Sequence, residues 1–388
     1  MSMQDQESNF LKALKQKGIT RRDFLKYCTL ISGVLAMPQP IANQISKALS
    51  QKKRMPVVWL EMQDCAGCSE SFLRASKPSV TEIILEKLSI DYHEVLMAAS
   101  GSLAEEAKAK TLAEGGYLLV VEGSIPLKDN GMYCCIGGRS AKDLLEEAVK
   151  NAAAVIAVGS CATFGGIPKA EPNPTQAVGV DQLVTSKPVV NLSGCPVNVV
   201  NLTATVVYYL TFGKLPALDA KKRPLFAYGA RIHDNCERRG HFDAGEFVKS
   251  WGDEGHQKGW CLYHMGCKGP ETFQNCPTVR WNDGTSWPIG SGHGCIGCAE
   301  PDFWDKSIYS PATLDEFAPP SVYPSTTTPI KTIKPQDAAA TGAAVGVILG
   351  VAATIAVKQL GKKKTPPTPE VGDEKNQATT KQDGKHDD

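Results

Sequence analysis

The sequence has almost no net charge: 42 Lys and Arg stand against 41 Asp and Glu, giving +1 at pH 7 over 388 residues. A chain without a basic excess lacks the electrostatic footprint of a nucleic-acid-binding protein. The 42% of apolar residues and the low net charge also exclude wholesale disorder. The length suggests about two to three domains.

Cysteine is too scarce for a small disulfide scaffold but more frequent than in an average cytosolic enzyme. The count is 13, and an odd number cannot be paired entirely into disulfides. The positions of these cysteines therefore carry most of the information about function.

Residues 1–50 are predicted to be a targeting segment. Arg21 and Arg22 precede a modest apolar run, Tyr27 to Met37, as in a bacterial twin-arginine export signal. That run is too short to span a bilayer. The alternative is a basic pair at the start of an ordinary helix. Cys28 lies inside the segment, and cleavage between Ala36 and Ser50 would remove it.

The other end carries a predicted membrane anchor. Residues 338–357 contain no charged side chain and follow a linker rich in Pro, Thr and Ser at 319–337. About 20 apolar residues suffice for a transmembrane helix. Lysines follow at once in the tail 358–388, which reads as disordered and cytoplasmic. The domain before the anchor is then expected on the periplasmic side of the bacterial inner membrane. The alternative is an Ala-rich soluble helix.

Between residues 55 and 211 the pattern alternates strand and helix, which predicts an α/β domain with a doubly wound, mostly parallel sheet. The expected strands are 57–62, 92–96, 117–122, 154–158 and 189–192, and the expected helices are 77–88, 104–114 and 142–152. Ligands of such folds bind beyond the carboxyl ends of the strands.

A set of four cysteines follows these strand ends: Cys65, Cys68, Cys161 and Cys195. Because the carboxyl ends of parallel strands meet at one edge, the four thiols are expected to form a metal or cluster site. Cys134 and Cys135 follow no strand end so directly, and we expect them to be structural or buried.

From 212 to 318 the periodicity disappears, and an irregular domain held by bound metal is expected. The candidate ligands are His233, Cys236, Cys261, Cys267, Cys276, Cys295 and Cys298. They divide as four and three, which suits a 4Fe–4S and a 3Fe–4S cluster. Disulfides and zinc remain alternatives. Zinc usually takes compact Cys-x2-Cys pairs, and the twin-arginine route typically carries proteins that folded around a cofactor.

The chain resembles the small subunit of membrane-bound, periplasmic nickel–iron hydrogenases of the uptake type. The resemblance rests on motifs in order along nearly the whole chain: residues 21–26, 65–71, 123–126, 159–162, 194–196, 233–238, 260–270 and 294–298. A related iron–sulfur subunit of a quinone-reducing complex resembles only the N-terminal domain.

The resemblance implies a flavodoxin-like N-terminal domain and three iron–sulfur clusters. The proximal 4Fe–4S cluster would use Cys65, Cys68, Cys161 and Cys195; the distal 4Fe–4S cluster His233, Cys236, Cys261 and Cys267; and the medial 3Fe–4S cluster Cys276, Cys295 and Cys298. Pro288 would stand where a fourth medial ligand is missing. Oxygen-tolerant relatives carry extra cysteines at the positions of Gly67 and Gly166, so an ordinary proximal cluster and oxygen sensitivity are expected.

The resemblance also implies the reaction and the partners. Hydrogen would be oxidised to protons and electrons, or formed from them, at a nickel–iron centre in a separate large subunit. This chain would carry the electrons to a membrane cytochrome b or quinone-reducing subunit, with or without a ferredoxin-like intermediary. Glu70, beside Cys68, is expected at the interface between subunits; the alternative is a residue that supports the ligands or lies on a proton path.

Overall fold

The computed structural model of the chain describes residues 3–16, 18–38, 40–51, 54–74, 88–282 and 284–312. These residues belong to one compact unit. The expected helix 77–88 lies outside them except for Leu88, as do the linker 319–337, the anchor 338–357 and the tail 358–388. Within the described ranges, no helix combines the length and the apolar character needed to cross a membrane.

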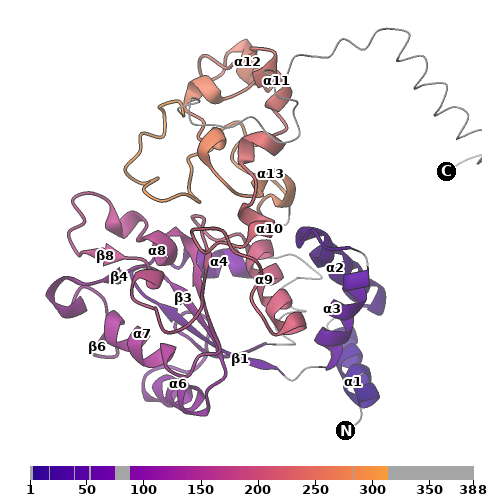
Figure 1. Cartoon of the computed structure of the whole chain (residues 1–388), viewed down its shortest axis with the longest axis vertical. Helices are drawn as coiled ribbons and strands as arrows, with labels where there is room; N and C mark the ends of the chain where they lie inside the picture. The colour runs from indigo at the N-terminus through magenta and orange to yellow at the C-terminus, as the bar shows by residue number, and fades with distance from the viewer. Residues whose placement is uncertain are drawn as a thin grey trace, which may run out of the picture. The chain divides into compact units, whose positions relative to one another are not determined.

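A parallel sheet of five strands forms the centre of the N-terminal domain (Figure 1). Its order is β2-β1-β3-β7-β9. The five strands are β1 (Met55–Glu61), β2 (Leu88–His93), β3 (Leu118–Glu122), β7 (Ala154–Val158) and β9 (Val189–Leu192). In chain order this is 2-1-3-4-5, the order of flavodoxin-like doubly wound folds. The expected α/β class and parallel sheet are confirmed.

The second strand differs from the prediction, which placed it at 92–96. It ends at His93 because the chain turns there: the backbone N–H of Met97 donates to the carbonyl of His93 at 3.1 Å. Val95 is 53% exposed. Apolar residues in this turn were mistaken for the end of a buried strand.

Helices cover both faces of the sheet. On one face, α6 (Ser102–Glu114) and α7 (Ala141–Val149) share a core with Val58, Leu60 and Leu119. On the other, α9 (Val199–Phe212) packs against alternate residues of the same strands, such as Trp59 and Leu118. Asn198 caps the start of α9 by accepting from the N–H of Val200. The expected helices at 104–114 and 142–152 correspond to α6 and α7; α9 was not predicted.

Shorter elements connect this framework. They are α4 (Gly67–Leu73), α8 (Gly159–Phe164) and two small ladders, β4 (Ile125–Pro126) with β8 (Ala177–Val178) and β5 (Cys135–Ile136) with β6 (Arg139–Ser140). Both α4 and α8 begin just after a sheet strand. They thereby project residues 65–68 and 159–161 beyond the same edge.

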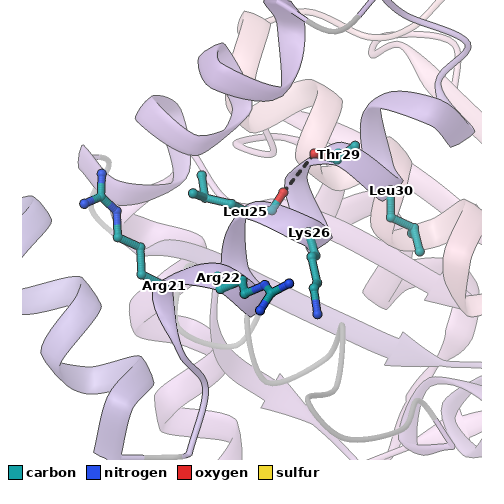
Figure 2. Close-up of a pocket in the computed structure, with 6 residues that line it drawn as sticks. All are labelled: Arg21, Arg22, Leu25, Lys26, Thr29 and Leu30. Carbon is teal, nitrogen blue, oxygen red and sulfur yellow. Dashed lines mark hydrogen bonds between the residues drawn. The ribbon is translucent and has the colours of Figure 1, made fainter. Parts of the chain in front are cut away.

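The N-terminal segment folds as three helices, α1 (Met3–Gln16), α2 (Arg21–Val34) and α3 (Pro40–Gln51). Their apolar side chains share one core with α9 and the sheet. Thr20 and Asp23 form a capping box at the start of α2, which fixes where the helix begins. The solvent-facing side of α2 carries Arg21, Arg22 and Lys26, next to Leu25 and Leu30 (Figure 2).

After α9 the described chain is irregular, as expected. It contains only the short helices α10 (Leu225–Tyr228), α11 (Arg239–Asp243), α12 (Glu254–Gln257) and α13 (Cys276–Val279), together with 3-10 turns. A small core cluster gathers Ile232, Val248, Cys267, Cys276 and Cys295. Its other buried members are Leu262, Trp287 and Ile289, so cysteine makes up part of this core.

Candidate metal centres

The structure brings the four strand-end cysteines together. Cys65, Cys68, Cys161 and Cys195 line one cavity beyond the carboxyl ends of β1, β7 and β9. Cys68 is buried, whereas Cys65 and Cys195 are exposed. This first set therefore opens onto the protein surface.

Glycines make room beside these sulfur atoms. A Cβ on Gly159 would collide with Sγ of Cys68, and a Cβ on Gly166 would collide with Sγ of Cys161. Both glycines also have a positive φ, +80° and +61°, which side-chain-bearing residues rarely adopt. The space next to the thiols is therefore kept free of protein atoms.

Glu122, at the end of β3, is a site residue that the sequence analysis did not identify. One carboxylate oxygen accepts from the N–H of Cys68 at 2.8 Å, and the other accepts from the N–H of Ser69 at 3.0 Å and its hydroxyl at 2.7 Å. Glu122 is 2% exposed. A charged residue at the end of an otherwise apolar strand was the available signal.

A second set lines a separate cavity: His233, Cys236, Cys261 and Cys267. His233 lies on a 3-10 turn, Ile232–Asn235, and its ring meets the Phe242 ring edge-on at 4.6 Å. Burial, more than the nearby Arg239, lowers the pKa of His233 to about 4. The imidazole is therefore neutral at physiological pH, the form that binds metal.

The third set is linked to the second by a hydrogen bond, from the backbone N–H of Cys295 to Sγ of Cys267. Cys276 begins α13, and it lines one cavity with Cys295, Cys298 and Pro288. Pro288 offers no ligand atom there. Cys195 of the first set lies on the wall of this cavity too, so the first and third cavities share a residue.

The three sets are too widely spread to hold single metal ions. In the part of the chain that the structure describes, the one group whose ligand atoms all lie within 4.8 Å of one another consists of carboxylates, Glu61, Asp64 and Glu122. Ligands of one tetrahedral zinc ion lie closer than that, since Zn–S bonds are about 2.3 Å. All thirteen cysteines are free, so the structure contains no disulfide. Spacing therefore favours polynuclear clusters over zinc.

Backbone N–H groups point at the sulfur atoms, as is common around iron–sulfur clusters. Val197 donates to Cys68 at 3.3 Å, Arg238 to Cys236 at 3.4 Å and Gly297 to Cys295 at 3.3 Å. Burial raises the pKa of Cys161 and Cys236 to about 12. Bare thiols would stay protonated there, so a cationic centre is needed to hold them as thiolates.

Three other residues singled out in the sequence lie outside these sets. Cys134 and Cys135 were expected to be structural or buried: Cys134 is half-buried, whereas Cys135 is exposed and lies on β5 of the β5–β6 hairpin. Glu70 is exposed and pairs with Arg74 at 2.8 Å. It makes no contact with the thiols in the structure.

Comparison with known proteins gives matches over the same parts of the chain. Residues 228–310 match the C-terminal family of NiFe/NiFeSe hydrogenase small subunits, and residues 65–209 match the family of the NADH ubiquinone oxidoreductase 20 Kd subunit. The second match is confined to the N-terminal domain, like the resemblance to quinone-reducing complexes.

Two curated relatives and one solved structure extend these matches. The uptake hydrogenase small subunit of Azotobacter vinelandii is 50% identical over 302 residues, 77% of this chain and 84% of the relative. The hydrogenase-2 small chain of Escherichia coli is 45% identical over 89% of this chain and 94% of the relative. The reduced, active Ni-Fe-Se hydrogenase from Desulfomicrobium baculatum is 34% identical, with a TM-score of 0.63 over 67% of this chain and 100% of that chain. The chain belongs to the family of nickel–iron hydrogenase small subunits.

Proposed function

We propose that this chain carries electrons between the nickel–iron centre of a large subunit and an acceptor in the membrane. Three iron–sulfur clusters would take them one at a time, with hydrogen oxidised to protons and electrons in the large subunit. The observation that carries this proposal is that every predicted ligand lies on one of three cavities, with Cys195 on the wall of two.

The ligand sets suit the cluster types that the resemblance implies. Cys65, Cys68, Cys161 and Cys195 would hold a proximal 4Fe–4S cluster, and His233, Cys236, Cys261 and Cys267 a distal one. Cys276, Cys295 and Cys298 would hold a medial 3Fe–4S cluster, whose missing iron needs no ligand opposite Pro288. The clusters supply reversible one-electron chemistry. The chain fixes their ligands, hydrogen bonds and burial, which set their potentials.

We further propose that the proximal site is covered by the large subunit. Cys65 and Cys195 are exposed. Two large apolar side chains close to proximal ligands in sequence are exposed as well: Leu73, on the helix that carries Cys68, is 53% exposed, and Ile167, next to Gly166, is 56% exposed. Exposed apolar side chains of this kind suit an interaction surface. Glu70 and Arg74 lie on the same helical segment and would join this interface.

We also propose that the chain is exported and anchored at the inner membrane. Arg21 and Arg22 are exposed on α2 (Figure 2) and would be available to an export receptor, while the opposite side of the helix is buried. With 338–357 as an anchor, the clusters would face the periplasm at the inner membrane. The acceptor there would be a cytochrome b or quinone-reducing subunit, with or without a ferredoxin-like intermediary.

Anaerobic purification through this chain tests the function. We expect a co-purifying large subunit that contains nickel, about eleven irons in this chain, and a 3Fe–4S signal in the EPR spectrum after oxidation. The brown protein should absorb broadly near 400 nm. A colourless preparation with stoichiometric zinc, or one whose cysteines are paired as disulfides, would refute the proposal.

A further inference from the structure

Neighbouring ligand sets touch each other through the backbone. The N–H of Cys295, in the medial set, donates to Sγ of Cys267, in the distal set, at 3.3 Å. No other residue separates the two sets at this point. The thiol of Cys295 faces its own cavity, so one residue presents a different group to each site.

This contact depends on how closely two chain segments approach. The N–H of Lys268 donates to the carbonyl of Cys295 at 2.7 Å, so residues 267–268 and 294–295 run in direct contact. A Cβ added to Gly294 would lie 3.0 Å from Cα of Cys267 and 3.2 Å from its Cβ. Glycine at position 294 is therefore what allows the hydrogen bond to Cys267 to form.

The proximal and medial sets also meet at one residue. Cys195, a proximal residue, lies on the wall of both cavities.

Ser160 holds this second junction in place. Its hydroxyl donates to the carbonyl of Cys298 and accepts from the N–H of Gly194 at 2.9 Å, while its own N–H donates to the carbonyl of Gly194 at 2.8 Å. The side chain is 1% exposed. One hydroxyl thus fixes the segment before Cys195 against the residue that carries the medial thiol.

We propose that Cys295 serves two neighbouring sites, as a thiolate ligand of the medial one and, through its backbone N–H, as a hydrogen-bond donor to a thiolate of the distal one. Cys195, on the wall of two cavities, joins the proximal site to the medial one. This inference rests on the proposed function. When one electron moves along the relay, one site is oxidised and its neighbour reduced by that electron. The N–H keeps its proton and no bond is formed or broken.

Two consequences follow from the hydrogen bond of Cys295. A donor aimed at a ligand thiolate stabilises the added negative charge of the reduced state, and so raises the potential of the receiving site. The receiving site is the distal one, at Cys267. The same bond connects the medial and distal ligand sets directly, so it should carry magnetic and electronic coupling between them.

Gly294→Ala in the complete, anaerobically purified heterodimer tests the medial–distal junction. The backbone at Gly294 is outside the left-handed region, so alanine can adopt it, and its methyl group only pushes the two segments apart. Gly240→Ala is the control, because Gly240 lies exposed on α11 and a Cβ there meets no atom within 4 Å.

At a fixed potential near the distal midpoint, we expect Gly294→Ala to lower the reduced-to-oxidised ratio of the distal site about threefold, since its donor is drawn away. The EPR interaction between distal and medial signals should weaken. Gly240→Ala should change neither. Full iron content with an unchanged distal potential and unchanged interaction in Gly294→Ala would overturn the inference.

If Gly294→Ala loses iron, its distal potential cannot be compared with that of the parent. The proximal–medial junction then tests the inference. Ser160→Ala removes the hydroxyl that holds the Cys298 carbonyl and the N–H of Gly194, and should weaken the EPR interaction between the proximal and medial sites. Ser193→Ala is the matched control, because the Ser193 hydroxyl also ties this region together, but by donating to the carbonyl of Ala299 at 2.8 Å and not to the residue that carries the medial thiol. Equal effects of the two variants would show a merely structural role and refute the inference.

Hydrogen–deuterium exchange catalysed by the nickel–iron centre distinguishes a failure of this inference from a failure of the proposed function. It should stay normal in all four variants, because it needs no electron relay. A heterodimer that lacks iron in this chain and shows no exchange even without substitutions would instead refute the proposed function.

Discussion

The carboxylate of Glu122 accepts a hydrogen bond from the backbone N–H of Cys68 at 2.8 Å, between residues 54 positions apart in sequence. The contact ties the end of β3 to the first turn of α4. It places an ionisable side chain directly behind a proximal thiol, where the chain that carries Cys68 and Ser69 turns away from the sheet.

Replacing Glu122 by alanine should destabilise the protein and weaken the proximal site. Three buried donors, the N–H groups of Cys68 and Ser69 and the indole N–H of Trp59, would lose their acceptor. Each unsatisfied buried donor costs about 1–3 kcal/mol. Anaerobic thermal unfolding and iron analysis should show a lower Tm and a loss of iron. Glu70→Ala, at an exposed glutamate, should change neither.

Glu61 should make stability dependent on pH. Burial, above all, raises the pKa of Glu61 to about 7 from its ordinary value of 4.5. The folded state then favours the protonated form, so this contribution to stability is fully present below about pH 4.5 and is lost as pH rises through 7.

Glu61→Gln should remove that dependence. In the parent protein the Ser69 hydroxyl donates to the Glu61 carboxylate at 2.9 Å. Glutamine keeps an oxygen that can accept this bond but cannot ionise. Denaturant unfolding should show the variant more stable than the parent at pH 8, with little difference at pH 4.5. A parallel pH profile in both proteins would contradict the assignment.

The contrast between Glu122 and the ligand residues shows what the sequence could and could not predict. The strands at 154–158 and 189–192 were predicted with the bounds of β7 and β9, because continuous β-branched runs mark buried parallel strands. Since those strands end at one edge, the gathering of Cys65, Cys68, Cys161 and Cys195 was also predictable.

Hydrogen bonds between residues far apart in the chain have no comparable signature in the sequence. Ser160 reaches the carbonyl of Cys298 across 138 residues, and nothing near Ser160 in sequence distinguishes it from another serine. Helix α9 was missed for a different reason: its residues are apolar on nearly all sides, so no amphipathic period marks it. The grouping of the loop-rich ligands into two sets required the resemblance.

His233→Cys should keep the distal site occupied but lower its reduction potential. A thiolate brings a negative charge where the neutral imidazole brings none, and added negative charge disfavours the reduced state. Redox titration followed by EPR measures the shift. His264→Asn, at a histidine stacked on Phe247 at 4.2 Å, is the control and should leave the potential unchanged. A distal potential that rises in His233→Cys would contradict the assigned ligand.

Arg223→Met should cost several kcal/mol of stability. The Arg223 guanidinium is 2% exposed and donates to Glu300 and Asp219, both at 2.9 Å. Its removal takes a buried charge partner from Asp219 and leaves Glu300 paired with the more exposed Lys221; breaking a buried ion pair costs about 3–5 kcal/mol. Lys221→Met tests the specificity, because Lys221 pairs with the same Glu300 but is 40% exposed. That variant should lose less than about 1 kcal/mol in anaerobic denaturant unfolding.

Glycine at positions 67 and 166 predicts an ordinary, oxygen-sensitive proximal cluster. In the oxidised heterodimer, an EPR-monitored redox titration should show a single one-electron step for the proximal site, and exposure to oxygen should abolish hydrogen oxidation. Two accessible one-electron steps would contradict this. Gly166→Cys alone should not confer tolerance. Its φ of +61° disfavours a side chain, and a Cβ there collides with Sγ of Cys161. Iron content should therefore fall in Gly166→Cys, and fall less in Gly67→Cys, where the added Cβ would lie 3.1 Å from Sγ of Cys65.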